Sequence, residues 1–487
     1  MDLSVAQGRP TDPAQDLAAS GPATIAVAVA TGVLLAIAAF GVYRVTHADR
    51  YYDHFVWQAA AFLEGQAAIR YPVATTAERL GNWFFQDVLP VGRVDGIDRG
   101  LIPFPPLPAV LLVPFVAAFG FATDEQLLFT ILAAIDVALC WWMIGRLPVS
   151  TAVRFGTTVF FAFGTAFWYT AQNTTTWYQA HIVAVGLTML AVGLALGADR
   201  SRHVVVGRPG ARDSDSDGAR FGVDRRGFAI GLLFGLATTA RLTVILAAPF
   251  FMLVGPGRGW WRRSWSVGIG AAIPVVALLA YNIATTGHVF HPAYDHLYQL
   301  EARAYTGLGY HPDWAAEDPR YLPQNLAIML SAAPEILPER QRDTLGTMDR
   351  PLCTAPGAGR GLFDAKCPLA LPRDIGMSIL LTSPALLLGL AAFRDRARRR
   401  IVAAAAIAVL LVTVANLMHF SQGWVQFGYR FGNDTLPFAL VLVALGFSRL
   451  VDRDPRPRWA MPLAVGLIAV SVAVNAWGVV WGRLLGW

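Results

Sequence analysis

The chain has 487 residues, of which 55% are hydrophobic and only 15% are charged, and its mean hydropathy is +0.47. Soluble globular domains usually carry about 25% charged residues, so this composition excludes an ordinary soluble protein. The net charge of +6 does not indicate nucleic-acid binding, because the basic residues concentrate in short loops between apolar stretches. The sequence predicts an all-α polytopic membrane protein whose partner is the lipid bilayer and not a nucleic acid.

Residues 1–21 are polar. They lack the basic region that precedes the apolar run of a signal peptide. We expect them to form a disordered cytoplasmic tail, followed by a first span at about 22–43. Residues 45–123 then form an outer loop. Its apolar segment 103–120 opens with Pro-Phe-Pro-Pro-Leu-Pro, which predicts a juxtamembrane helix lying at the membrane surface.

About eleven transmembrane helices are predicted from stretches long enough to cross the hydrocarbon core. After the first, they lie at 124–145, 152–170, 177–197, 228–240, 242–254, 266–285, 375–393, 401–418, 435–450 and 460–483. The two spans on either side of Arg241 are too short to cross alone, which predicts a broken pair buried by its neighbours.

The orientation follows from the arginines. A cytoplasmic N-terminus places the five densest arginine clusters inside, at residues 146–154, 199–226, 258–263, 394–400 and 449–458. Counting 103–120 as a full span would put the next four of these clusters outside, against the positive-inside rule. The sequence thus predicts a transmembrane module at 22–285, an extracytoplasmic loop at 286–374 and C-terminal transmembrane helices at 375–487.

Three cysteines are present. Cys140 lies in an apolar stretch and is expected to be inert packing, whereas Cys353 and Cys367 fall in the loop 286–374. Disulfides persist outside the cytoplasm, so this pair is a candidate bridge. Spacing alone does not establish the geometry of a disulfide, and free thiols stay the alternative.

The first candidate site follows the first span, where Asp49, Asp53 and Trp57 share one helix edge beside His54. A carboxylate at the water–lipid boundary can deprotonate a hydroxyl, since apolar surroundings raise its pKa. Another face of the same helix is apolar and is predicted to lie on lipid; its residues are Tyr52, Phe55, Val56, Ala59, Phe62 and Leu63. Solvated acids in an interfacial loop are the simpler alternative.

The second candidate site is the segment 419–434 between two late spans. Arg430 can bind phosphate by two parallel hydrogen bonds, and Trp424, Gln426 and Tyr429 are candidate substrate contacts. One alternative is an aromatic belt at the membrane interface with a snorkelling arginine. Another is a simple ion pair between Arg430 and the nearby Asp434.

Two ionisable residues occur within or beside predicted spans. Arg241 is costly there unless it is paired or lines a cavity, so it is a candidate functional residue, with a place at the outer interface as the alternative. His181 is a candidate substrate contact or a packed histidine. No residue spacing assigns metal ligands, which leaves a divalent metal open. The absence of Walker, Gly-x-Ser-x-Gly and His-Glu-x-x-His motifs argues against an ATPase, a serine hydrolase and a metalloprotease.

Four short motifs occur along the chain. An acid after the first span is followed by Phe55 and Ala-Phe-Leu-Glu-Gly at 61–65, and Pro-Pro-Leu at 105–107 opens a juxtamembrane helix ending in Phe-Gly at 119–120. Thr-Ala-Arg-Leu-Thr stands at 239–243, and Gln-Phe-Gly-Tyr-Arg at 426–430 precedes a late span. With these motifs the chain resembles the GT-C superfamily of membrane glycosyltransferases, near the bacterial relatives of protein O-mannosyltransferases and aminoarabinose transferases. That family usually has Arg-Pro where this chain has Arg241 and Leu242.

This resemblance implies an enzyme that moves a hexosyl or pentosyl group from a polyprenyl-phosphate-linked sugar to a glycan, lipid or protein acceptor. The reaction would occur on the outer face of a bacterial plasma membrane. Asp53 is the expected base, with Asp49 second, because the family's acidic pair is here spaced by four. Arg430 and Arg241 would bind the donor phosphate.

A transporter or lipid flippase is the rival interpretation. A transporter is expected to have charged residues near the midplane of several spans. In this chain Asp136 is the main charged residue at such a position.

Overall fold

The computed structural model describes most of the chain outside its N-terminal tail and several loop segments. The described residues are 22–48, 53–70, 87–206, 223–257, 259–296, 298, 311, 313–344, 346, 348–421, 423 and 425–487, without the side chains of 94 and 200–206. The predicted tail at 1–21, Asp49 and Trp424 lie outside the described residues.

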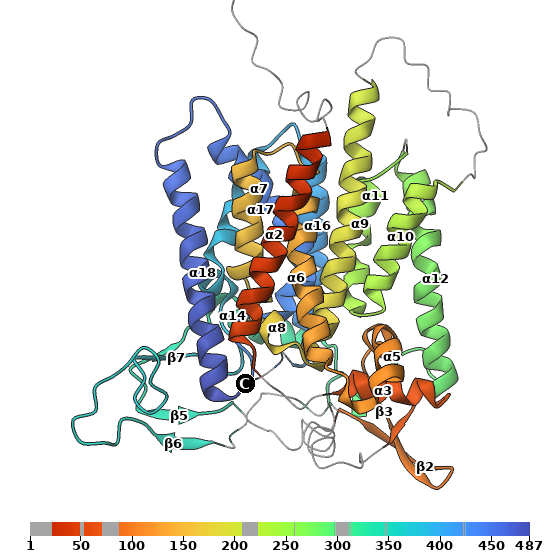
Figure 1. Ribbon diagram of the computed structural model, residues 1–487, viewed down its shortest axis with the longest axis vertical. Coiled ribbons are helices and arrows are strands. Elements are labelled where there is room, and N and C mark those ends of the chain that lie inside the picture. Colours follow the sequence, from red (N-terminus) through yellow and green to blue (C-terminus); the bar gives the residue numbers. More distant parts are fainter. Residues whose placement is uncertain are drawn as a thin grey trace, which may run out of the picture.

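Within this part of the chain, seven helices are long and apolar enough to cross a membrane, as expected of a multi-pass membrane protein. They form one bundle (Figure 1). They are α2 (Pro22–Thr46), α6 (Glu125–Ile144), α9 (Thr176–Val206), α12 (Trp260–Thr286), α16 (Arg399–Met418), α17 (Leu436–Val451) and α18 (Ala460–Leu485). The short helix η6 (Arg430–Thr435) leads directly into α17, and together they form one candidate span.

Shorter helices run beside the long ones. They are α7 (Thr151–Phe163), α8 (Phe167–Asn173), α10 (Arg225–Thr238), η2 (Leu242–Ala247), α11 (Ala248–Leu253), α15 (Ile379–Thr382) and η5 (Pro384–Arg394). The predicted break around Arg241 is present, since α10 ends at Thr238 and Arg241 is extended. The segments 152–170 and 375–393, predicted as single helices, are each interrupted. Pro384 explains the second interruption, because it disfavours a helical Ser383.

Close packing of α10 against α12 depends on glycines. A Cβ atom at Gly231 would overlap the carbonyl oxygen of Val267, and one at Gly270 would overlap the carbonyl oxygen of Phe228. Small residues let two membrane helices approach until their backbones touch, which gains van der Waals contact where lipid offers no hydrophobic driving force. This contact fixes the end of α10, and with it the chain break at Arg241.

One end of the bundle, here named the α3 end, carries the described part of the segment between α2 and α6 (Figure 1). It contains α3 (His54–Leu63), α5 (Leu107–Phe119), the short helix η1 (Gly120–Ala122) and a three-stranded antiparallel sheet in the order β1-β3-β2. The strands are β1 (Ile69–Arg70), β2 (Leu89–Val94) and β3 (Ile97–Leu101). The apolar segment 103–120 thus lies beside α3 at this end, and η1 follows it directly.

The prediction that one face of α3 lies on lipid is wrong for most of that face. Phe55, Val56 and Ala59 are at most 1% exposed within the protein, whereas Leu63 is exposed. The reason is that α5 packs along α3 and covers the side that the sequence pattern assigned to lipid.

The described part of the segment 286–374 lies at the same end. It contains η4 (Pro319–Tyr321) and α14 (Leu322–Ser331), which bind the end of α16 through hydrogen bonds from Asp318 N to Met418 O and from the Asn325 side chain to Leu417 O. Two small two-stranded sheets follow. They pair β4 (Glu335–Ile336) with β7 (Ala370–Leu371) and β5 (Arg340–Arg342) with β6 (Asp349–Pro351).

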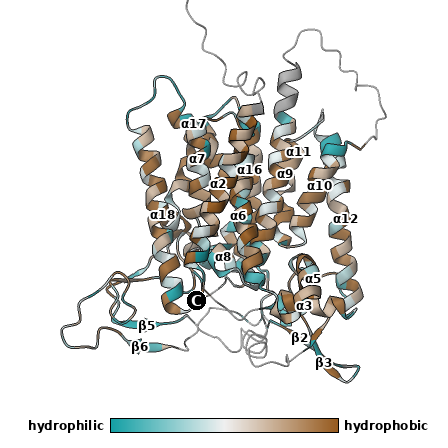
Figure 2. Ribbon diagram, viewed as in Figure 1, coloured by the Kyte–Doolittle hydropathy of each residue, from teal (hydrophilic) through white to brown (hydrophobic). Residues whose placement is uncertain are grey.

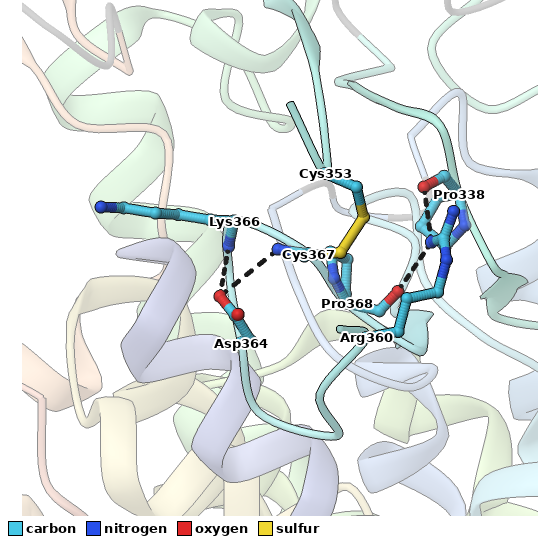
Figure 3. The surroundings of a disulfide bond; sticks show 7 residues. All are labelled: Pro338, Cys353, Arg360, Asp364, Lys366, Cys367 and Pro368. Carbon is cyan, nitrogen blue, oxygen red and sulfur yellow. Dashed lines mark hydrogen bonds between the residues drawn. A yellow bond between two sulfur atoms is a disulfide. The ribbon is translucent and has the colours of Figure 1, made fainter. Parts of the chain in front are cut away.

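These two sheets form a lobe, residues 335–371, that extends sideways near the end of α18 (Figure 1). Cys353 and Cys367 are joined by a disulfide within it (Figure 3). The Arg360 guanidinium donates to the carbonyl oxygens of Pro338 and Pro368, at 2.9 and 3.0 Å, and so joins three loop segments of the lobe.

Hydropathy divides the molecule along the bundle axis. Apolar side chains cover the helices, whereas polar residues gather at α8, at the ends of the bundle and on the β5–β6 hairpin (Figure 2). The end opposite the α3 end is named the arginine end, because α16 begins there at Arg399 and α17 ends there after Arg449.

Candidate active site

Asp53 stands at the start of α3 and meets a second carboxyl group. Its side chain makes no capping bond to α3, and it forms a hydrogen bond with the side chain of Glu125, the first residue of α6. Glu125 is 5% exposed. A hydrogen bond between two carboxyl groups requires that one of them hold a proton. The pair can therefore take up or release a proton at the boundary of the bundle, where the sequence placed a single base.

His54 and Trp57 lie in α3 directly behind this carboxyl pair. His54 Nδ1 is 3.0 Å from the Thr176 hydroxyl, and burial lowers the pKa of His54 to about 3, so the imidazole is neutral. The Trp57 ring is 4.8 Å from the His54 ring, and both residues are at most 2% exposed. The structure places these two predicted substrate contacts in the buried wall of the site.

A continuous set of aromatic rings runs from α3 to η6. Phe104 contacts the rings of His54, Trp177 and Tyr294, with centroid distances of 6.0 to 6.5 Å. The Tyr294 ring lies 6.3 Å from His419, which lies 6.1 Å from Phe431. Each ring comes from a different segment, so the fold assembles an aromatic lining from residues spread over much of the chain.

Asp87 is a buried acid that the sequence did not single out. It is 5% exposed and accepts a hydrogen bond of 3.0 Å from the indole nitrogen of Trp177. Burial raises the pKa of Asp87 to about 7, although the Trp177 hydrogen bond and the positive charge of Arg430 oppose this shift. Asp87 therefore brings a carboxyl group that titrates near neutrality into the neighbourhood of Arg430.

The Asp434 side chain is fully buried and forms hydrogen bonds with four residues. These residues and Asp434 are named here the Asp434 cluster. Arg241 donates to it from Nε at 3.2 Å to both carboxylate oxygens and from a terminal nitrogen at 2.9 Å. His181 Nδ1 lies 2.8 Å away, the Thr243 hydroxyl donates at 3.0 Å, and the Asn416 amide donates at 3.3 Å. Two predicted site residues, Arg241 and His181, thus meet on one carboxylate.

Arg430 is half-buried and lies close to this cluster without joining it. Its guanidinium carbon is 5.4 Å from the ring centroids of Tyr178 and Phe431. It makes no ion pair or hydrogen bond within the part of the chain that the structure describes, so the interpretation of an Arg430–Asp434 ion pair is wrong. Gly423 has a φ of 71°, and a Cβ there would lie 2.6 Å from the guanidinium carbon of Arg430. Glycine therefore leaves room for this side chain.

Gln426 and Tyr429 support the loop that carries Arg430. Gln426 is fully buried, and its amide donates to the carbonyl oxygens of Gly423 and Ile375. Tyr429 is 2% exposed and packs against Met329 in a small core cluster. Both are predicted substrate contacts, and the structure buries both in the loop that carries Arg430.

A run of buried polar residues joins α8 to α9 behind the aromatic lining. Both amide atoms of Asn173 lack a hydrogen-bond partner among the described residues. Buried polar atoms without partners usually bind water or a ligand, so this run is a candidate floor of the site. Its members are at most 1% exposed: Thr170, Gln172, Asn173, Thr174, Thr175, Thr176 and Gln179.

No metal centre is apparent in the described ranges, where no three or more His, Cys, Asp or Glu residues gather in a way that could hold an ion. The sequence also assigned no ligands. The carboxyl pair of Asp53 and Glu125 supplies two acidic groups to the site.

The arrangement combines a guanidinium without a partner among the described residues, a carboxyl pair and an aromatic lining at one end of an apolar bundle. It can bind an anion at Arg430, exchange a proton at Asp53 and Glu125, and cover a ring-shaped ligand with aromatic side chains. The chain matches no protein-family model, and comparisons with curated proteins and with solved structures found no similar protein.

Proposed function

We propose that the chain is a membrane glycosyltransferase of the GT-C type, which moves a sugar from a polyprenyl-phosphate donor to a glycan, lipid or protein acceptor. The observation that carries the proposal is Arg430, a half-buried guanidinium with no acceptor in the described residues. Placing an unpaired charge there is unfavourable unless an anion arrives. A phosphate linked to a lipid brings both the anion and a tail suited to the bilayer.

The proposed topology has eleven crossings. The seven long helices supply seven of them, and the units α7–α8, α10, η2–α11 and α15–η5 supply the other four. With the arginine end in the cytoplasm, the positive-inside rule places the α3 end, the site and the loop 286–374 outside a bacterial plasma membrane. The Cys353–Cys367 disulfide fits that placement, because disulfides persist outside the cytoplasm.

The proposed reaction uses the carboxyl pair on the acceptor side. The acceptor hydroxyl loses its proton to Asp53, its oxygen forms a bond to the anomeric carbon, and the bond from that carbon to the phosphate oxygen breaks. The leaving polyprenyl phosphate keeps the electron pair, and Arg430 stabilises its charge. Glu125 holds Asp53 in place and shares the proton. Arg241, whose side chain is 20% exposed, adds a partly neutralised second cation near the phosphate.

A transporter or flippase stays the second candidate because of Asp136. This acid lies in the middle of α6, is 4% exposed, and one of its carboxylate oxygens has no hydrogen-bond partner within the described part of the chain. An ionisable group within a span is by default a functional candidate. Transport of the lipid-linked sugar would leave the anomeric bond intact, which separates the two candidates chemically.

The proposal is tested by transfer of radiolabelled sugar from a panel of polyprenyl-phosphate donors in membranes with matched expression. Asp53→Asn and Glu125→Gln should each lower the transfer rate by about 10²- to 10⁴-fold, the usual contribution of a general base. Asp49→Asn tests the second candidate base, and transfer retained in this variant but lost in Asp53→Asn would assign the base to Asp53. Asp98→Asn is the control, because Asp98 is exposed and pairs only with Arg93 among the residues described at this end.

Three outcomes would contradict the proposal. Transfer that stays at the level of empty membranes with every donor would argue for transport, and so would a requirement for Asp136 in movement of the intact lipid. Activity in Asp53→Asn and Asp49→Asn equal to that of the wild type would remove the proposed base.

A further inference from the structure

The arginine end contains a hollow of about 610 Å³ between the end of η5 and the end of α17. This volume lies within the range of about 300–1,000 Å³ usual for ligand sites. The hollow lies far from Arg430 along the bundle, because η5 and α17 both run from the α3 end to the arginine end. Its lining residues are Phe393, Arg394, Asp395, Arg396, Ala397 and Arg449.

The hollow has an uncompensated positive charge. Its one acid, Asp395, is 7% exposed and already pairs with Arg398 at 2.6 Å, outside the lining. The guanidinium groups of Arg394, Arg396 and Arg449 have no ion pair or hydrogen-bond acceptor among the described residues. Three guanidinium groups around one space repel each other, and an anion with several oxygens relieves this repulsion by accepting bidentate hydrogen bonds.

An apolar stripe leads along η5 to this hollow. Leu387, Leu390 and Phe393 are 42%, 64% and 59% exposed. They are spaced by three residues, and a 3₁₀ helix has about three residues per turn, so their side chains stack in one line. The line ends at Phe393, which also lines the hollow. A hydrocarbon chain along the stripe would therefore place its polar end among the three arginines.

We propose that this hollow and stripe form a binding site for an anionic phospholipid, separate from the donor site at the α3 end. The phosphate group binds Arg394, Arg396 and Arg449, and one acyl chain covers Leu387, Leu390 and Phe393. Basic pockets between transmembrane helices commonly bind anionic head groups in this way. A phosphatidylcholine head group binds less well, because its cation is repelled by three arginines and the single acid is already engaged.

The binding test uses the purified full-length chain in detergent, titrated with dioleoyl phosphatidylglycerol and read out by native mass spectrometry. The triple variant R394Q/R396Q/R449Q should lower the affinity roughly a hundredfold, since each basic residue near an anionic head group contributes about 1 kcal/mol. The control R453Q/R456Q/R458Q removes the same charge from the exposed turn after α17, and its affinity should fall by less than about threefold.

The apolar stripe is tested with a second variant, L387A/L390A/F393A. It should weaken binding of dioleoyl phosphatidylglycerol about tenfold and leave binding of the short-chain dihexanoyl lipid unchanged, because only the long chain reaches along the stripe. Inorganic phosphate at millimolar concentration should not displace the dioleoyl lipid from the wild type.

Three results would overturn the proposal. Equal losses in the two triple arginine variants would show that only the total charge of this end matters. Equal binding of dioleoyl phosphatidylcholine would remove the anionic head group as the ligand. Displacement of the lipid by millimolar phosphate, together with an unaffected stripe variant, would show a site for free anions. None of these outcomes depends on transferase activity, so the proposed function is tested separately.

Discussion

Arg241 and Arg430 lie beside the same aromatic ring yet differ completely in their surroundings. Their guanidinium carbons are 5.2 and 5.4 Å from the centroid of Phe431. Arg241 donates three hydrogen bonds to the buried Asp434, whereas Arg430 meets no acceptor among the described residues. The charge of Arg241 is thus balanced by a carboxylate of the protein itself. The charge of Arg430 has no such partner among the described residues, so Arg430 is the arginine that predicts an anionic ligand.

The largest expected effect is a loss of stability when Arg241 loses its partner Asp434. Asp434→Ala leaves the partly buried Arg241 beside His181 without its counter-charge, and breaking a largely buried pair in this way costs about 3 kcal/mol of stability. Thermal unfolding in detergent measures the loss. Asp98→Ala, which removes an exposed partner of Arg93, should change stability by less than about 1 kcal/mol. An equal, small change in both variants would contradict the structural role of the Asp434 cluster.

Arg430→Gln tests whether the arginine without a partner among the described residues binds the donor phosphate. We expect sugar transfer to fall by about 10²- to 10³-fold, as for removal of one group that stabilises a developing anion. Thermal stability should change little, because Arg430 makes no ion pair within the described residues. Arg241→Gln is the comparison variant and should lower both activity and stability. A strong loss of stability in Arg430→Gln would remove the distinction between the two arginines.

Asp87 gives a pH-dependent prediction close to Arg430. Burial raises its pKa from an ordinary value near 4 to about 7, so the folded protein holds a proton that the unfolded chain releases. The stability contributed by the protonated carboxyl is fully present below about pH 4 and is lost as the pH rises from there to about 7. Asp87→Asn should therefore gain about 2 kcal/mol of stability over the wild type between pH 5 and pH 8. Thermal unfolding at both pH values measures it, and a gain independent of pH would contradict the assignment.

The smallest expected effect tests one hydrogen bond of the Asp434 cluster. Thr243→Val removes the hydroxyl that donates to Asp434 at 3.0 Å and should cost about 1 kcal/mol, because Arg241 still satisfies the carboxylate. Thr31→Val on the exposed face of α2 is the control, since its hydroxyl bonds only its own helix at Val27. A Thr243→Val loss as large as that of Asp434→Ala would mean that the cluster depends on the hydroxyl.

The long helices were predictable because hydropathy alone identifies stretches that suit lipid, and the break at Arg241 followed from two apolar runs too short to cross. The interruptions within 152–170 and 375–393 were not predictable from hydropathy, because apolar residues stand close to each break on both sides. The apolar face of α3 pointed to lipid only because the sequence does not show that α5 covers it.

The sequence identified several residues of the candidate site, but it did not show which of them form hydrogen bonds or ion pairs with each other. Arg430 and Asp434 are four residues apart, which suggested an ion pair, yet Asp434 binds Arg241 from 193 positions earlier. Glu125 follows Asp124 in the first turn of α6, where acids commonly stabilise a helix start, and nothing in the sequence distinguishes a carboxyl that reaches Asp53. Asp87 stands in no motif, so only its packing against Trp177 identifies it.

The glycine contact between α10 and α12 has a consequence for how the protein is made. α10 has only 14 residues and begins with two arginines, so it is a poor candidate to enter a membrane alone. Its backbone makes its glycine-mediated contact with α12, which is synthesised later, after η2 and α11. Biogenesis is therefore expected to hold α10 near the insertion machinery until α12 emerges. A side chain at Gly231 or Gly270 would then act first as an insertion defect, before it lowers the stability of the finished bundle.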